Sequence, residues 1–591
     1  MKDLALPPMS RIPSESAHHD DAPPTEDGRP AGGTTPDGPA TTAAGRGRTR
    51  RVFGAIVTAV AAMLVYLGLI VPDTIAHHSD NAFVPGAFVR LPMEAILGGA
   101  VLIVVPGRWR RLTAAIMGGG LGVLVVLKVA NAGFLMYLGR RFNPVLDWTL
   151  LGDGYNALTE TNGHTYATTV AVGAVVLTVV VITLMTLSAV RLGTVTARHA
   201  GPARRALVAL SAVWIVLALT GVTFFPGNPV AADSTAALAK STVKEIPAAI
   251  RDQATFNRAM DTDAYVNVPA KQRLAALTGK DFVIGVVESY GRSALQDPKM
   301  SALVDPVLSA GTRDLAAKGF HAKSGFLTSS TYGGGSWLAH GSFQSGLWID
   351  SPQRYRQLIS SNRLTITKAF HEAGWQTYGL EPGNTTAWPE GKFYGYDSVY
   401  DSRNLSYQGP AFGWSRMPDQ YTLAQFQKDV YGKPHAPLMA EITMTSSHNP
   451  WTPLPKFVDW NTIGDGTIYG PMARQGETRT QLWQSPQATQ LAYATSVAYS
   501  VQSLVSWVEK YGDKNLVLVM FGDHQPASIV SGNNASHDVP VTIIAHDPAV
   551  LDRIADWGWQ DGLKPNPQAP VWLMDSFRDK FFAAFGGEPA R

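Results

Sequence analysis

The sequence predicts an N-terminal α-helical membrane bundle followed by a C-terminal α/β domain with a mostly parallel sheet. Five apolar stretches of membrane length lie before residue 226, and the chain after it has a soluble composition. In that second part helical patterns alternate with short β-type runs, which is typical of a parallel sheet with helices on both faces. Three of these runs, 283–288, 442–448 and 516–524, each end in a side chain that can bind a metal or a phosphate.

The composition fits a chain with membrane and soluble parts. Charged residues make up 16% of the chain, below the roughly 25% of average soluble proteins. The net charge of +3 is small for 591 residues and does not indicate nucleic-acid binding. The absence of cysteine excludes disulfides, thiolate metal sites and a cysteine nucleophile.

Residues 1–51 are predicted to be a disordered cytoplasmic tail. They are rich in Pro, Gly, Thr, Asp and Ala and have no apolar periodicity. The tail ends in a basic cluster, Arg46, Arg48, Arg50 and Arg51. It is too long and too polar for a signal peptide, so the first apolar segment is expected to be a retained anchor.

Residues 52–225 are predicted to form five transmembrane helices, since each stretch reaches or approaches the roughly 20 residues that cross a bilayer. The predicted spans are 52–71, 87–106, 112–138, 165–190 and 206–225. The second is the weakest, because Arg90, Pro92 and Glu94 lie near its start. Basic residues precede span one and separate spans two from three and four from five, which places those segments in the cytoplasm. Arg140 and Arg141 lie on the opposite side, a minor conflict. Five crossings put the chain after residue 226 outside the cell.

Lys128 lies inside the third predicted span. An ionisable side chain at membrane depth often marks a functional site. It can also snorkel to the interface or pair within the bundle, and the sequence leaves these alternatives open.

The remaining chain is predicted to contain a juxtamembrane linker, 226–279, and one large α/β domain, 280–591. Short helices are expected in the linker at Ala236–Lys244 and Lys271–Leu277. In the domain, a long helix over 488–511 precedes the strand at Leu516. A helix over Thr365–Glu372 precedes a strand over Trp375–Leu380.

The ends of the three β-type runs suggest one metal centre, because buried parallel strands deliver their last residues to one edge of a sheet. Asp523 and His524 follow an apolar run and Gly522, and a carboxylate with an imidazole suits Zn²⁺ or Mn²⁺. Asp523 could instead cap the next turn, with His524 merely exposed. Glu288 ends the first run and His448 the second; each could also be an ordinary surface or loop residue.

Ser336 follows three glycines, Gly333 to Gly335, which allow positive φ and close backbone approach. The next residues have helical spacing, with Ser336, His340, Phe343 and Leu347 along one stripe. A serine at a helix N-terminus lies where a phosphate or an alkoxide-like oxygen is stabilised. It can also be a simple N-cap. A serine hydroxyl needs a base or a metal to react, so the candidate metal ligands favour a nucleophile.

These residues together resemble the alkaline phosphatase/sulfatase superfamily, and within it the lipoteichoic acid synthase-like phosphoglycerol transferases. The resemblance extends over most of the chain, from five membrane spans through a linker to an extracellular sulfatase-type domain. It rests on VVESYGRS around Glu288, the Gly-rich loop before Ser336, and FGDHQP around Asp523 and His524.

The resemblance implies roles for individual residues. Glu288, Asp523, His524 and the Ser336 oxygen would bind the metal, and Ser336, in place of the usual Thr, would be the nucleophile. His448 would contact substrate, as would Trp388 in AWPEGKFYGYD. The companion Arg of that Trp has no clear match, although Lys392 is nearby. His537, in SHDVP, resembles a phosphate-contacting His of phosphoethanolamine transferases.

A true sulfatase activity is disfavoured. Sulfatases convert a Cys or Ser in a Cys/Ser-x-Pro-x-Arg setting, whereas Leu338 and His340 occupy the Pro and Arg places here.

The resemblance implies a membrane-anchored transferase that moves a phosphoglycerol-type head group from a phospholipid to a cell-envelope glycan or glycolipid through a phospho-serine intermediate. Phosphatidylglycerol is the simplest donor, and the expected cofactor is Mn²⁺, with Mg²⁺ or Zn²⁺ as alternatives. The alternative functions are a phosphodiesterase or phosphatase, a phosphoethanolamine transferase, or a non-catalytic polymer-binding membrane protein.

Overall fold

The computed structural model describes residues 41–77, 88–138, 140–225, 228–532 and 535–587. Most of the predicted tail, residues 1–40, lies outside the described residues, as do residues 226–227 of the predicted linker. By its internal contacts the chain divides into two units, Met1–Val57 and Thr58–Arg591.

Among the described residues, four helices are long and apolar enough to cross a membrane. They are the stretch Thr49–Ile70 of α1 (Thr41–His77), α3 (Gly107–Leu138), α5 (His164–Arg198) and α6 (Ala200–Thr220). Helix α1 begins at Thr41, so the last part of the predicted tail is helical.

The second predicted span is not confirmed as a crossing. Helix α2 (Met93–Val104) has 12 residues, which makes it about 18 Å long, against roughly 30 Å of hydrocarbon. The residues before it do not extend the helix, because Leu91–Pro92 (β1) pairs with Ala231–Ala232 (β4) as a parallel bridge. The described residues therefore contain four long candidate spans. The shorter apolar helix α2 stands in the place of the second predicted span.

Lys128 pairs within the membrane bundle. Its side chain is 3% exposed, and its Nζ donates hydrogen bonds to Leu69 O and Thr235 Oγ1, both at 2.8 Å. Thr235 belongs to α7 (Ser234–Asp261), a single 28-residue helix in the region predicted as a linker. Of the two alternatives to function, pairing is the one observed. The linker ends in α8 (Ala270–Arg273) and a 3₁₀ turn at Ala275–Leu277.

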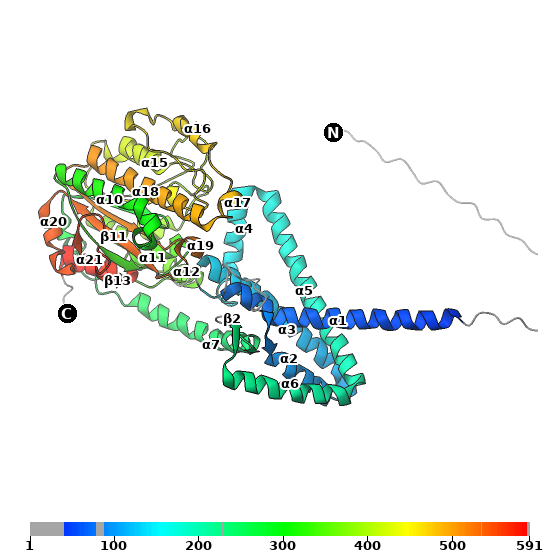
Figure 1. The fold of residues 1–591 in the computed structure, drawn as a ribbon. Helices are drawn as coiled ribbons and strands as arrows, with labels where there is room; N and C mark the ends of the chain where they lie inside the picture. Colours follow the sequence, from blue (N-terminus) through cyan, green and yellow to red (C-terminus); the bar gives the residue numbers. More distant parts are fainter. Residues whose placement is uncertain (1–40, 78–87, 139, 226–227, 533–534, 588–591) are drawn as a thin grey trace, which may run out of the picture. The chain divides into compact units, whose positions relative to one another are not determined.

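The C-terminal domain, predicted to be catalytic, is built on a mixed, mostly parallel sheet (Figure 1). Four strands run parallel to β5 (Asp281–Val287). They are β10 (Leu516–Gly522) on one side and β9 (Leu438–Met444), β7 (Gln376–Glu381) and β8 (Ser398–Asp401) on the other. Beyond β10, β11 (Asp538–Ala545) is antiparallel to both β10 and β6 (His321–Thr328). The short strands β12 (Gln560–Asp561) and β13 (Val571–Leu573) complete that side by pairing with β6.

Helices cover both faces of this sheet, which explains why its central strands are continuous apolar runs. Every residue of β5, β9 and β10 is buried, as expected for strands covered on two sides. One face packs against α10 (Pro298–Ala317) and α18 (Pro486–Tyr511). The other packs against α13 (Ile366–Ala373) and α21 (Phe577–Gly586). The helices predicted at 488–511 and 365–372 are thus present, the second with Thr365 as its N-cap.

Candidate active site

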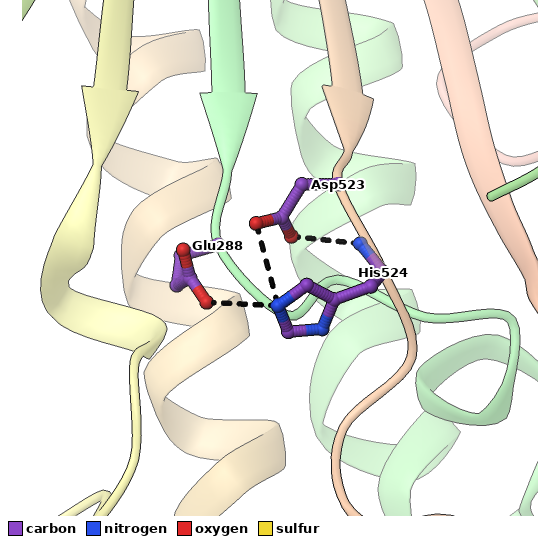
Figure 2. Close-up of side chains that lie close together, drawn as sticks. All are labelled: Glu288, Asp523 and His524. Carbon is purple, nitrogen blue, oxygen red and sulfur yellow. Dashed lines mark hydrogen bonds and ion pairs between the residues drawn. The ribbon is translucent and has the colours of Figure 1, made fainter. Parts of the chain in front are cut away.

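The carboxyl ends of β5 and β10 bring three predicted metal ligands together. These strands are parallel neighbours, with Val287 in register with Gly522, so Glu288 and Asp523 leave the sheet side by side. A Cβ at Gly522 would collide with the carbonyl oxygen of Tyr290, so only glycine permits this close approach. Figure 2 shows Glu288, Asp523 and His524 converging just beyond the two strand ends.

Glu288, Asp523 and His524, called the trio below, have the spacing of a metal site. His524 Nε2 lies 3.3 Å from Glu288 Oε1 and 3.5 Å from Asp523 Oδ2. One ligand atom from each residue lies within 4.8 Å of the other two. All three side chains are buried, so their charges are not offset by water.

The surroundings of the trio point its ligand atoms at one another. Nδ1 of His524 lies 2.8 Å from Gln525 O, so Nδ1 carries the proton and Nε2 faces the trio. Asp523 Oδ1 accepts hydrogen bonds from the backbone N–H groups of Ser289 and His524, at 2.7 and 2.8 Å. Its other oxygen, Oδ2, is buried and has no hydrogen-bond partner among the described residues. Because a buried oxygen of this kind needs a partner, the trio fits a divalent cation of the Zn²⁺ or Mn²⁺ type.

The electrostatics of the trio support this assignment. Burial and the charge of Glu288 raise the pKa of Asp523 to about 6. Burial opposes ionisation of Glu288, but the hydrogen bond and charge of His524 hold its pKa well below the usual range. Burial likewise opposes protonation of His524, yet the two carboxylates raise its pKa to about 9. Two buried carboxylates thus attract positive charge, which a proton or a metal ion can supply.

The glycine loop delivers Ser336 to the trio. Gly333 and Gly335 have φ of +70° and +82°, the left-handed region that glycine adopts without a steric penalty. Gly335 is the N-cap of α11 (Ser336–Ser345), and Ser336 is its first helical residue. Its hydroxyl donates to Glu288 Oε2 at 2.9 Å and lies 3.2 Å from His524 Nε2. Ser336 is therefore not the N-cap that the sequence left as an alternative.

A pocket of about 640 Å³ opens over Ser336; we call it the Ser336 pocket. Its wall contains two of the predicted substrate-contacting residues, Trp388 and His448. It also contains residues without a predicted role, among them Asp153, His340, Arg356, Glu381 and Trp414.

His448 is held in one orientation. Its Nδ1 lies 2.6 Å from Asn449 O, and its ring stacks on Trp414 with centroids 3.9 Å apart. Burial lowers the pKa of His448, so at neutral pH its Nε2 is an unprotonated acceptor.

His537 is not among the described residues that line the Ser336 pocket, although burial and the charge of His524 in the trio lower its pKa. It precedes β11, its carbonyl oxygen accepts a hydrogen bond from Ser329 N at 2.9 Å, and its ring lies 5.3 Å from that of Tyr332.

The sequence reasoning missed several pocket residues. Arg356, on α12 (Pro352–Ile359), brings a guanidinium group to the pocket, whereas Lys392 lines a separate depression. No local pattern marks Arg356. Glu381 is the last residue of β7, and Glu288 directly follows β5, so the strand-end pattern that identified Glu288 could also have identified Glu381.

Comparison with known proteins gives a family for this domain. Residues 280–542, less than half of the chain, match the family model described as Sulfatase. A search of curated proteins found no match.

Several solved structures are similar at low identity. The chain is 13% identical to the lipoteichoic acid synthase LtaP from Listeria monocytogenes, covering 54% of this chain and 75% of that one with a TM-score of 0.35. It is 14% identical to the Streptococcus pyogenes phosphoglycerol transferase GacH, covering 57% and 82% with a TM-score of 0.35. It is 11% identical to the lipooligosaccharide phosphoethanolamine transferase EptA from Neisseria meningitidis, covering 89% and 95% with a TM-score of 0.43. These similarities are too distant to carry a substrate. Residues 280–542 are thus similar to the Sulfatase family model, and the trio and Ser336 all lie within the matched residues.

Proposed function

We propose that the chain is a membrane-anchored, metal-dependent transferase that moves a phosphoglycerol-type head group from a phospholipid to a cell-envelope glycan or glycolipid. The observation that carries this proposal is that the Ser336 hydroxyl contacts two residues of the trio. Its oxygen lies 2.9 Å from Glu288 Oε2 and 3.2 Å from His524 Nε2. A hydroxyl in this place has the activation that serine nucleophiles need.

The trio would hold the cofactor, with Mn²⁺ first and Mg²⁺ or Zn²⁺ as alternatives. A divalent cation there lowers the pKa of a nearby hydroxyl and neutralises charge on phosphoryl oxygens. Glu288 accepts the hydrogen bond of the Ser336 hydroxyl and so positions its oxygen for attack on phosphorus. The proton that Ser336 gives up passes in the end to the leaving diacylglycerol oxygen.

Ser336 would act in two displacements. In the first, a bond forms between Ser336 Oγ and phosphorus, the bond from phosphorus to the diacylglycerol oxygen breaks, and that oxygen takes up a proton. In the second, an acceptor hydroxyl attacks phosphorus and the serine oxygen leaves and regains a proton. His448 is neutral and its Nε2 is unprotonated, so it is suited to take the proton from the hydroxyl of the glycan or glycolipid that receives the head group.

The wall of the Ser336 pocket also supports a second candidate, a phosphoethanolamine transferase. Trp337, Trp388 and Trp414 line the pocket together with the carboxylates of Glu381 and Glu390. Aromatic faces and carboxylates suit an ammonium head group, so phosphatidylethanolamine belongs beside phosphatidylglycerol in any donor assay.

The deciding assay uses the full-length protein in detergent with Mn²⁺ and phospholipids carrying a fluorescent acyl tail. Diacylglycerol release by wild type, and its loss in Ser336→Ala, is the expected result. Ser345→Ala is the matched control, because Ser345 lies on the same helix and its hydroxyl bonds only Gly341 O among the described residues. Release by Ser336→Ala at the wild-type rate would exclude Ser336 as the nucleophile.

The same assay separates the candidate functions. Release only from phosphatidylethanolamine would favour the second candidate. Head group passed to water alone would indicate a phosphodiesterase.

The proposed location is a multi-pass protein of the cell membrane with the catalytic domain outside. It rests on the basic segments around residues 108–111 and 198–205, which the positive-inside rule places in the cytoplasm, and on the three candidate spans from residue 107 onward, α3, α5 and α6, whose crossings then end outside. The absence of cysteine makes the test simple. Lys433→Cys, at a side chain 60% exposed, should react with an impermeant maleimide in intact cells, and His199→Cys, between α5 and α6, should react only after lysis. The reverse pattern would place the domain inside.

A further inference from the structure

A second group of charged side chains lies in the wall of the Ser336 pocket. His340 follows Ser336 by one turn of α11, a spacing that brings Cβ atoms within about 5–6 Å, and both residues line the pocket. Glu381 at the end of β7 lines it as well, and Glu441 is a buried acid in the middle of β9. We call His340, Glu381 and Glu441 the His340 cluster.

Glu441 fixes one ring nitrogen of His340. Nδ1 of His340 lies 3.1 Å from Glu441 Oε1. The other carboxylate oxygen accepts hydrogen bonds from the Tyr396 hydroxyl, at 2.7 Å, and from Gln344 Nε2. Because the carboxylate acts as an acceptor in all three contacts, Nδ1 of His340 carries a proton. The imidazole is thereby held in a single orientation.

The other ring nitrogen of His340 is buried and unpartnered. Nε2 has no hydrogen-bond partner among the described residues, although the side chain is only 11% exposed. Burial opposes protonation, but the hydrogen bond and charge of Glu441, with the charges of Glu381 and Asp523, raise the pKa of His340 to about 9. At neutral pH Nε2 therefore also carries a proton. A buried charged donor without an acceptor is costly, unless a ligand supplies the acceptor.

A metal ion does not fit this cluster as it fits the trio. Within the described part of the chain, the trio has one ligand atom per residue at the mutual spacing of a shared ion, and the His340 cluster does not. A protonated imidazole is also a donor rather than a ligand. The chemistry of the cluster suits an anion.

We propose that His340 is a catalytic residue whose Nε2–H donates a hydrogen bond to a non-bridging oxygen of the phosphoryl group that Ser336 receives. Glu441 is the positioning residue that orients the ring and keeps it charged. This assignment deepens the proposed function and rests on it, since it takes the phosphoryl group to be the one bound at Ser336. In this assignment the phosphoryl group meets a fixed, positively charged hydrogen-bond donor in the pocket wall, and that donor lies on α11, the same helix as Ser336.

Anion binding tests the proposal without any turnover. The full-length Ser336→Ala protein, loaded with Mn²⁺, is titrated with inorganic phosphate in a calorimeter, with and without His340→Gln. Loss of a charged hydrogen bond should weaken phosphate binding by about 10- to 100-fold. His371→Gln is the matched control, because His371 forms a comparable pair with Asp397 at 3.1 Å but is half-exposed and is absent from the described lining of the Ser336 pocket. Equal phosphate affinity with and without His340 would overturn the proposal.

Turnover gives a second, independent measure. In the wild-type background His340→Gln should lower kcat by about 100-fold, as loss of a transition-state donor does elsewhere, with KM for the lipid little changed. The thermal midpoint shows whether the variant is folded. If it is not folded, Glu441→Gln replaces it as the test variant. Glu441→Gln should lower phosphate affinity by a smaller factor, and an unchanged affinity would overturn the proposal.

The two proposals can fail separately. If wild type releases no diacylglycerol but its phosphate affinity still depends on His340, the proposed function fails while the anion site stands. Activity that requires the neutral imidazole, rising with pH through its pKa, would make His340 a base and overturn the proposal.

Discussion

The trio and the His340 cluster each place a histidine among carboxylates, fully buried in the trio and largely buried in the cluster, yet their contacts differ in kind. In the trio, one imidazole nitrogen faces two carboxylates, and Asp523 Oδ2 has no hydrogen-bond partner among the described residues. In the His340 cluster, one nitrogen faces a single carboxylate that is hydrogen-bonded on its other side, and the second nitrogen has no hydrogen-bond partner in the part of the chain that the structure describes. The first arrangement has a spare acceptor and suits a cation; the second has a spare donor and suits an anion. Nearly the same residue types therefore give opposite preferences, decided by which atom is left over.

The largest effect should come from the spare acceptor. Asp523→Asn removes one of two buried carboxylates and with it most of the attraction for a divalent ion. We expect Mn²⁺ content near zero and activity lower by about 10⁴-fold or more, measured by elemental analysis and diacylglycerol release.

Asp547→Asn is the control for that change, since Asp547 pairs with Lys280 and caps α20 (Pro548–Asp552) outside the pocket. Full Mn²⁺ occupancy in Asp523→Asn would show that the unpartnered oxygen is not a ligand and would remove the contrast between the two clusters.

A smaller effect, in the pH dependence, should come from Glu441→Gln. The folded pKa of His340 is raised to about 9, so the stabilisation from its charge is complete below the ordinary value of about 6.5 and is lost as pH rises through 9. Removing the carboxylate charge should move the alkaline loss of phosphate binding to lower pH and reduce affinity about tenfold at pH 7. Calorimetric titrations from pH 6 to 10 measure both. An unmoved alkaline limb would mean that Glu441 does not set the charge of His340.

The smallest effect on activity should come from a third buried charge, Lys128. Its Nζ donates to Leu69 O and Thr235 Oγ1, and it is absent from the described lining of the Ser336 pocket. Lys128→Met should lower stability by about 1–3 kcal/mol, seen as a lower unfolding temperature in detergent, while kcat stays within twofold. Thr235→Val should give a milder change of the same kind. A large loss of kcat in a folded Lys128→Met protein would instead indicate a catalytic role at membrane depth.

The same contrast explains which parts of the molecule the sequence could predict. The trio was predictable because its members follow apolar strands, and parallel neighbours end at one edge; β5 and β10 meet that condition. The placement of His340 on a stripe with Ser336 was also predictable, from helical spacing. Its partner Glu441 was not, because a buried acid in the middle of β9 has no local signature.

In the membrane part, the local sequence pattern predicted a longer second helix than the structure contains. The stretch 87–106 has enough apolar residues to suggest a crossing, but Leu91–Pro92 pairs with Ala231–Ala232, about 140 residues later in the chain. That long-range pairing shortens α2 to 12 residues, and composition does not reveal it. Likewise, Arg356 and Asp153 reach the pocket only through tertiary packing.

Asp153 carries one more consequence. It belongs to α4 (Trp148–Asn162), which lies between two membrane-spanning helices, and it lines the same pocket as Ser336. The Ser336 pocket is therefore not a property of the C-terminal domain alone. Cutting the chain after α6 would release a domain that keeps Ser336 but loses part of the pocket wall. A shed or secreted form should then differ in what it accepts, and not only in how often it meets a lipid. Anchoring in this protein would be part of molecular recognition as well as a means of localisation.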